Sequence, residues 1–238
     1  MKILIVSGFL GAGKTTFIKR LARNVDQRFA ILENEYGAAG IDGARLGQNR
    51  QGTQKNVWEM TEQCICCIGK KDFAASVLTI ANVVDPEYLI VEPTGVGSLA
   101  RIIENLRQIE YERIQLLSPV TIVDVYSYRR YMAEYPELYQ DQIRSADTII
   151  VSKTEACQAE EKQRIQKFLQ EINPQAKIIT DYASTMTRED YQSLLLGGRY
   201  EKEVQDTQSG EKMPETFSFE NIRMEAPETL WCFLEQII

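Results

Sequence analysis

The chain has 238 residues, of which 44% are hydrophobic and 26% are charged, so it is long enough for one large globular α/β domain. Its net charge of −7 argues against non-specific nucleic-acid binding, and the absence of histidine restricts metal ligands to thiolates, carboxylates, backbone oxygens or water. No apolar run reaches the ~20 residues of a membrane helix. The first residues enter an apolar strand without a signal-peptide pattern, so we expect a cytoplasmic protein with reduced cysteines.

Apolar β-branched runs alternate with segments of helical spacing, which predicts an α/β fold with a mostly parallel central sheet and helices on both faces. We expect strands at residues 2–7, 29–34, 87–91, 119–124, 147–151 and 176–180. We expect helices at residues 14–24, 71–83, 97–107, 138–145 and 158–172. The segment 35–56 is rich in Gly, Asn, Gln and Asp and predicts a loop.

The C-terminal part has a different composition. Residues 201–214 are polar and are expected to act as a linker, whereas residues 216–224 alternate like a strand and residues 226–238 have helical spacing. One strand and one helix cannot form an independent core. Residues 215–238 are therefore expected either to pack on the main domain or to begin a truncated C-terminal α/β domain.

A complete phosphate-binding loop, G-x-x-x-x-G-K-[ST], occupies residues 8–16 between the first strand and the first helix. Its glycines allow backbone N–H groups to turn toward a phosphate, and the helix N-terminus adds a favourable partial charge. Lys14 would neutralise the β- and γ-phosphates, and Thr15 would offer its hydroxyl to Mg²⁺. The predicted nucleotide-binding residues here are Gly8, Gly11, Ala12, Gly13, Lys14, Thr15 and Thr16.

Two further segments carry carboxylates that suit a nucleotide hydrolase. Glu92-Pro-Thr-Gly95 follows an apolar strand, at the position where such enzymes hold Mg²⁺ and sense the γ-phosphate. Glu92 is predicted as a Mg²⁺ ligand and Gly95 as a nucleotide contact. Asp42, in the loop after the second strand, is predicted to approach Mg²⁺ or to position the attacking water. The alternative for both segments is a solvated turn.

Cys64-Ile-Cys66-Cys67 places three sulfurs within four residues, which is enough to hold one soft cation such as Zn²⁺. Three cysteines without histidine predict an open or transient metal site rather than a closed structural one. The alternative is a buried stretch of inert thiols.

Ser152-Lys-Thr-Glu155 follows a strand where many GTPases carry Asn-Lys-x-Asp. Glu155 can accept two hydrogen bonds from guanine, Lys153 can cover the ring, and Ser152 is a shorter brace than asparagine. The alternative is a helix N-cap, because Ser-x-x-Glu is also a capping pattern.

Together these motifs resemble the CobW-like branch of the P-loop GTPases, a metallochaperone family related to UreG and HypB. The resemblance covers about residues 1–180 and rests on residues 8–16, 33–37, 64–67, 92–95, 123–124 and 152–155. It implies that residues 1–200 form a P-loop GTPase domain. Three departures are Ala38 where the family usually has Glu, Ser-Lys-Thr-Glu in place of Asn-Lys-x-Asp, and the absence of histidine-rich stretches.

The resemblance implies a slow GTPase that couples GTP hydrolysis to the binding of a transition metal and its delivery to a client metalloprotein. The predicted catalytic residues are Lys14, Asp42 and Glu92; the Mg²⁺ ligands are Thr15, Asp42 and Glu92; the ligands of Zn²⁺ or another transition metal are Glu33, Cys64, Cys66 and Cys67. Its expected partners are GTP or GDP and the client, and a homodimer is compatible with this interpretation.

The alternative is a nucleotide-gated module that assembles or activates a cobalamin-dependent or other cofactor enzyme without metal transfer. A small-molecule kinase would also use a P-loop, but it would leave the cysteine cluster and residues 152–155 unexplained.

Overall fold

The structure is a computed structural model that describes residues 1–35, 57–63 and 70–204, without the side chains of residues 33–35, 57–63 and 70–72. Its strands are β1 (Lys2–Ser7), β2 (Phe29–Glu35), β3 (Val57–Gln63), β4 (Tyr88–Glu92), β5 (Gln115–Leu116), β6 (Val120–Asp124), β7 (Thr148–Ser152) and β8 (Lys177–Ile179). Its helices are α1 (Lys14–Asn24), α2 (Lys70–Val83), α3 (Leu99–Arg107), α4 (Tyr128–Glu134), α5 (Pro136–Arg144), α6 (Ala159–Ile172), α7 (Tyr182–Thr185) and α8 (Arg188–Leu196).

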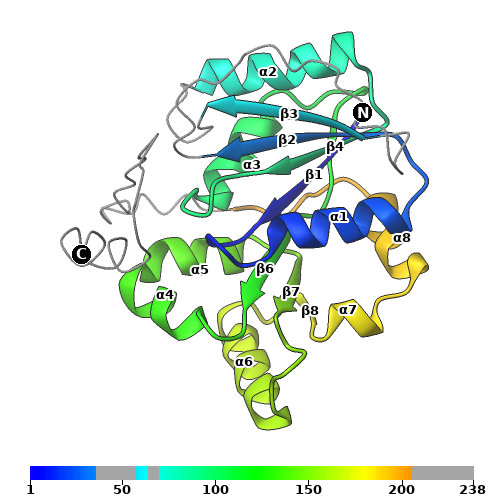
Figure 1. The fold of residues 1–238 in the computed structure, drawn as a ribbon. Helices are drawn as coiled ribbons and strands as arrows, with labels where there is room; N and C mark the ends of the chain where they lie inside the picture. The colour runs from blue at the N-terminus through cyan, green and yellow to red at the C-terminus, as the bar shows by residue number, and fades with distance from the viewer. Residues whose placement is uncertain (36–56, 64–69, 205–238) are drawn as a thin grey trace, which may run out of the picture.

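These strands form one sheet in the order β3-β2-β4-β1-β6-β7-β8, with β5 paired to the start of β1. All of the pairs between these strands are parallel, and helices cover both faces of the sheet (Figure 1). The predicted α/β class is therefore confirmed. Every predicted strand or helix in the described residues is present, with ends that differ by at most two residues from the expected ones.

Some elements of the fold were not predicted from the sequence. Strand β3 pairs along its full length with β2 at the end of the sheet order, yet its sequence Val-Trp-Glu-Met-Thr-Glu-Gln lacks the continuous apolar run typical of a strand buried on both faces. Helix α8 was also missed, although its N-terminus carries a capping box between Thr187 and Asp190. The loop expected at 35–56 and the elements expected at 216–224 and 226–238 lie outside the described residues, apart from Glu35, which ends β2.

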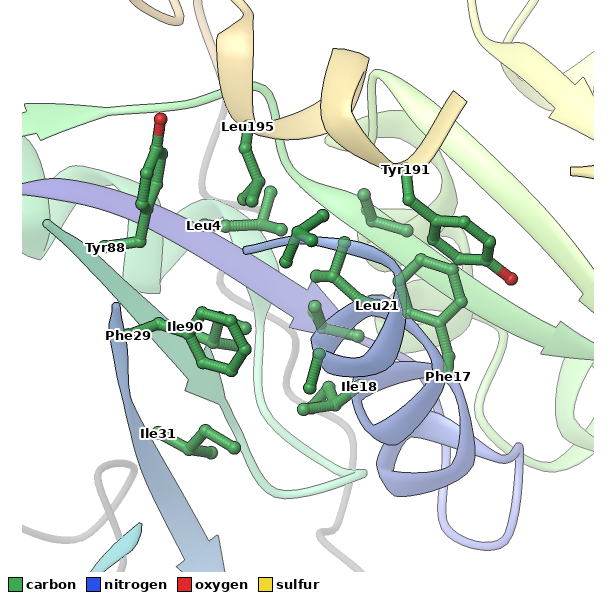
Figure 2. Close-up of a cluster of buried hydrophobic side chains, with 14 of the residues drawn as sticks. Leu4, Phe17, Ile18, Leu21, Phe29, Ile31, Tyr88, Ile90, Tyr191 and Leu195 are labelled. Atoms are coloured by element: carbon green, nitrogen blue, oxygen red, sulfur yellow. The ribbon is translucent and has the colours of Figure 1, made fainter. Parts of the chain in front are cut away.

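Alternate residues of the central strands pack into cores on opposite faces of the sheet. Leu4 of β1 and Ile90 of β4 lie in a cluster with residues of α1 and α8, which Figure 2 shows. Ile3 and Ile5 of the same β1 strand lie in another cluster, formed with α2 and α3. Burial on both faces explains why the central strands are almost purely apolar.

A further core, which includes Val123 and Val151, packs β6 and β7 against α5 and α6. Among the described residues, no helix is long and apolar enough to cross a membrane.

The parallel arrangement brings the carboxyl ends of several strands to one edge of the sheet. Strand β1 ends there at Ser7 and continues into the predicted phosphate loop, and β4 ends there at Glu92. Strands β6 and β7 end in register, with Asp124 beside Ser152. Ligands of open parallel sheets bind beyond the carboxyl ends of the strands, so this edge is where a nucleotide site is expected.

Candidate nucleotide-binding site

The loop between β1 and α1 has the backbone conformation of a phosphate cradle. Gly8, Gly11 and Gly13 have φ angles of 142°, 71° and 99°, which residues with side chains rarely adopt. A Cβ atom at Gly8 would also lie 2.4 Å from the main-chain oxygen of Ile122 on β6. Glycine is thus required at position 8 both by the turn and by the close approach of the neighbouring strand.

Lys14, the first residue of α1, is folded back into this loop. Its Nζ donates hydrogen bonds to the main-chain oxygens of Gly8 at 2.9 Å and Phe9 at 3.4 Å, and the residue is only 7% exposed. Burial lowers the pKa of Lys14, and nearby Glu92 partly opposes that shift. A buried ammonium held mainly by carbonyl oxygens would gain from an anionic ligand, which a phosphate group could supply.

Thr15 and Glu92 meet across the mouth of the loop. The Thr15 hydroxyl donates to Oε1 of Glu92 at 3.1 Å and to Oε2 at 3.3 Å. A hydroxyl and a carboxylate next to Lys14 are hard oxygen donors of the kind that Mg²⁺ prefers, so these residues fit that ion. Asp42, the third predicted ligand, lies outside the described residues.

Gly95 packs directly on the phosphate loop. A Cβ atom at this position would lie 2.3 Å from the main-chain nitrogen of Leu10 and 2.9 Å from the carbonyl carbon of Phe9. Main-chain atoms cannot move aside cheaply, so only glycine fits. The structure thus brings the predicted γ-phosphate sensor into contact with the loop.

Ser152 connects the end of β7 to the same loop. Its hydroxyl donates to the main-chain oxygen of Ala12 at 2.6 Å, and the residue is buried. The helix-cap alternative for Ser152 is wrong, because the next helix, α6, begins at Ala159 and its N-cap is Gln158. The side chain braces the phosphate loop instead.

Lys153 is held by a carboxylate from the neighbouring strand. Its Nζ lies 2.7 Å from Oδ2 of Asp124, which is 6% exposed and also accepts hydrogen bonds from the Tyr126 amide at 2.8 Å and the Ser127 hydroxyl at 3.0 Å. Burial raises the pKa of Asp124, but these three donors outweigh it and hold the pKa below its usual value. Glu155 follows in an exposed turn.

The predicted site residues can be sorted by where the structure places them. At the carboxyl edge of the sheet it brings together Gly8, Gly11, Ala12, Gly13, Lys14, Thr15, Glu92, Gly95, Ser152 and Lys153. Thr16 and Glu155 are exposed. Glu33 is aligned in register with Glu92, so its backbone also lies near this edge.

Asp42, Cys64, Cys66 and Cys67 lie outside the described residues. Within the described part of the chain, no three residues among Cys, Asp and Glu form a group that could hold a metal.

The roles of Asp124 and of two residues of α5 were not predicted from the sequence. Gln142 donates to the main-chain oxygens of Gly95 and Gly97, and Asp141 accepts from the amide of Leu99. The available signal was weak: three polar residues, Gln140, Asp141 and Gln142, separate Tyr139 from Ile143 in the helix.

Comparison with known proteins agrees with this geometry. Residues 2–180 match the family model described as the CobW/HypB/UreG nucleotide-binding domain. The zinc chaperone YeiR of Escherichia coli is 30% identical over 178 residues, which cover 74% of this chain and 53% of YeiR. The zinc chaperone CobW of Pseudomonas aeruginosa is 27% identical over 194 residues, covering 69% of this chain and 52% of that protein. The chain thus spans about half the length of these curated relatives.

Solved structures support the fold. The Zn(II)-bound YjiA GTPase from E. coli aligns with a TM-score of 0.57 at 21% identity, covering 85% of this chain and 66% of YjiA. The hydrogenase maturation factor HypB from Archaeoglobus fulgidus aligns with a TM-score of 0.52 at 17% identity, covering 82% of this chain and 89% of HypB. With a family model that matches most of its length, this chain belongs to the CobW/HypB/UreG family of nucleotide-binding domains.

Proposed function

We propose that this chain binds GTP with Mg²⁺, hydrolyses it slowly, and couples the nucleotide to the binding of Zn²⁺ or another transition metal for delivery to a client metalloprotein. The observation that carries the proposal is the convergence of Lys14, Thr15 and Glu92 at the mouth of the phosphate loop. The loop amides and Lys14 would hold the phosphates. Thr15 and Glu92 would hold Mg²⁺, which when bound neutralises charge on the β- and γ-phosphates.

Several groups of the site are already held in place for this task. Ser152 fixes the loop at Ala12, and Gly95 lies against the loop at Leu10. Preorganised donors stabilise developing negative charge without a cost of reorganisation at the moment of reaction. Hydrolysis is expected to be slow because the chain has no histidine base, so a client or partner would supply the missing group.

Coupling to a metal is supported by where strand β3, the segment before the cysteine motif, ends. Strand β3 ends at Gln63, next to Cys64 in the sequence, and Gln63 is in register with Glu35 at the end of β2. Two residues earlier in β2, Glu33 is in register with Glu92. Strand β3, which directly precedes the cysteine motif in the sequence, therefore ends at the edge of the sheet that carries the predicted Mg²⁺ ligand. YeiR and CobW, both zinc chaperones, are relatives of this chain.

Metal analysis of the purified protein, with and without a non-hydrolysable GTP analogue, tests this proposal. We expect about one Zn²⁺ per chain, with an affinity that changes with the nucleotide and falls at low pH because thiolates must lose their protons to bind. Cys66→Ser should weaken zinc binding, whereas Cys157→Ser, at a lone cysteine elsewhere, should not.

Equal zinc affinity of Cys66→Ser and the parent would show that the metal ligands are misassigned. Indifference of the parent to every transition metal would favour the alternative, a nucleotide-gated module that activates a cofactor enzyme without metal transfer.

A further inference from the structure

Helix α4 contacts the phosphate loop through one tyrosine. The Tyr131 hydroxyl donates to the main-chain oxygen of Leu10 at 3.1 Å. The ring of Tyr131 also lies against that of Phe9, with centroids 4.5 Å apart, and Phe9 is only 3% exposed. Tyr139 of α5 meets the same Phe9 ring edge to face, with centroids 5.1 Å apart. The second and third residues of the phosphate loop are thus held by side chains from outside the loop.

The contact with Leu10 restrains a peptide group that carries a loop amide. The carbonyl oxygen of Leu10 and the N–H of Gly11 belong to one planar trans peptide group, in which they point in opposite directions. Because the Leu10 oxygen is turned toward the Tyr131 hydroxyl, the Gly11 N–H points away from α4. The Ser152 hydroxyl acts in the same way on the Ala12 oxygen, two residues further along the loop. Two hydroxyls from separate elements therefore fix two peptide groups of the loop.

The anchoring of Phe9 also affects Lys14. The main-chain oxygen of Phe9 accepts from the Ala12 amide at 3.0 Å and from Nζ of Lys14 at 3.4 Å. The side chain of Phe9 packs on α4 and α5, while its carbonyl group faces the buried ammonium. The aromatic contacts thus help to place one of the oxygens that hold Lys14.

Helix α4 is itself fixed to the sheet by a buried carboxylate. Asp124, at the end of β6, accepts from the Tyr126 amide and from the Ser127 hydroxyl, just before α4 begins at Tyr128. The Tyr131 amide then donates to the main-chain oxygen of Ser127 at 3.1 Å in the first turn of the helix. Tyr131 therefore lies one helical turn from a residue that the sheet holds.

We propose that Tyr131 is a positioning residue for nucleotide phosphates. Its hydroxyl and ring restrain the phosphate loop before a ligand arrives, so less conformational freedom is lost when a phosphate binds. Without the hydroxyl, the peptide group between Leu10 and Gly11 would have more freedom to rotate, and ordering it on binding would cost affinity. The effect should be equal for different bases, because Tyr131 contacts the loop at Phe9 and Leu10. The inference rests on the proposed nucleotide binding.

The test compares the dissociation constants for GDP and for ADP, both with Mg²⁺, in the parent, Tyr131→Phe and Tyr131→Leu, at a temperature where each protein is folded. We expect Tyr131→Phe to weaken both nucleotides by about threefold, in the lower part of the range for one hydrogen bond, because Tyr131 is only half-buried. Tyr131→Leu also removes the ring contact with Phe9 and should weaken both by about tenfold. The preference for GDP over ADP should stay that of the parent.

Tyr128→Phe is the matched control on the same helix. The Tyr128 hydroxyl accepts from Nε of Arg129 at 2.9 Å, and the Tyr128 ring packs against Phe168 of α6. This variant therefore removes a tyrosine hydroxyl and leaves the contacts of Tyr131 with the phosphate loop in place. It should leave both dissociation constants unchanged.

Unchanged dissociation constants in both Tyr131 variants, even with lower melting temperatures, would overturn the proposal and leave Tyr131 as a structural contact. A loss of affinity for GDP without an equal loss for ADP would also overturn it, because the helix would then act through residues 152–155. Should Tyr131→Leu fail to fold, Tyr131→Phe carries the test alone, since it keeps the ring. A parent that binds neither nucleotide would refute the proposed function itself, and this proposal with it.

Discussion

At the phosphate end of the candidate site (residues 8–16), the contact that holds Lys14 forms within one short segment of chain, whereas at the base end (residues 152–155) the contact that holds Lys153 joins two distant segments. Lys14 binds the main-chain oxygen of Gly8, six residues away. Lys153 instead binds Asp124, which lies on another strand and is 29 residues away. A local arrangement forms as soon as the strand, loop and helix form, whereas the base end depends on the correct order of β6 and β7 in the sheet.

The two lysines also differ in their surroundings. Lys14 is buried among carbonyl oxygens, so its charge is poorly compensated until an anion arrives. The side chain of Lys153 is 47% exposed and already paired with a buried carboxylate. We therefore expect changes at the phosphate end to affect nucleotide binding more than changes at the base end, and the following variants test that order.

Lys14→Ala should have the largest effect. Loss of the ammonium should weaken GDP binding at least ~100-fold, because a preorganised charge on the phosphates disappears from a site sheltered from water. Calorimetric titration with GDP measures this effect, and circular dichroism checks that the fold is retained. Lys19→Ala, at an exposed lysine of the same helix, is the matched control and should bind as the parent does. Unchanged binding or hydrolysis in Lys14→Ala would reject the phosphate-loop assignment.

Thr15→Val should come next. This variant keeps the shape of the side chain and removes the hydroxyl that contacts Glu92. We expect the strengthening of GDP binding by Mg²⁺ to shrink by about tenfold, because one oxygen ligand of the ion is lost. Titrations with Mg²⁺ and with a chelator measure the difference. If Mg²⁺ strengthens binding to the same extent in both proteins, Thr15 is not a ligand.

Asp124→Asn tests the base end. The variant should weaken GDP binding several-fold and lower the free energy of unfolding at neutral pH by about 1–3 kcal/mol, because Lys153 loses a charged, buried partner. The pKa of Asp124 is depressed in the folded state, so its stabilising contribution is present above its ordinary pKa and is lost as pH falls through the folded value. The difference in stability between parent and variant should therefore vanish in acid.

Asp85→Asn is the control for this variant, because Asp85 forms an exposed pair with Arg113 that should contribute little. Denaturant titrations across the acidic range measure both differences. A difference between parent and Asp124→Asn that persists at low pH would contradict the role given to the Asp124 charge.

Glu155→Gln should have the smallest effect, limited to base selectivity. An amide cannot accept both guanine hydrogen bonds through two oxygens, so the preference for GDP over ADP should fall by a few-fold. Glu160→Gln, at an exposed carboxylate of α6, changes the net charge equally and should leave the preference intact. An equal fall in both variants would show that general electrostatics, not base recognition, sets the preference.

The fold could be predicted where the local signal is strong. Strand β1 and helix α1 have the bounds expected from the sequence, because an apolar run and a helical period meet at the glycine-rich loop. Helix α4 was missed because it is only seven residues long and is separated by a single residue from Pro136, which starts α5. Strand β3 was missed because polar residues interrupt its apolar pattern.

In the candidate site, too, residues with a strong local sequence signal were predicted and residues without one were not. Residues of the phosphate loop could be named from one motif, because the motif itself sets their types and their spacing. The roles of Asp124 and Gln142 could not, because each acts on a segment that only the tertiary fold brings near: Lys153 for the first and Gly95 for the second. A buried polar side chain on a helix carries no local mark of its partner.

Calorimetric titration of the parent protein with GDP and with ADP, each with Mg²⁺, tests the central claim most directly. The phosphate end should bind both nucleotides, and the base end should make GDP the tighter ligand. The preference for GDP over ADP should be smaller than an Asn-Lys-x-Asp motif would provide, because the Ser152 hydroxyl already donates its hydrogen bond to Ala12. A measurably tighter dissociation constant for GDP is the result expected. Equal affinities for GDP and ADP would contradict guanine recognition, and failure to bind either would contradict the nucleotide site itself.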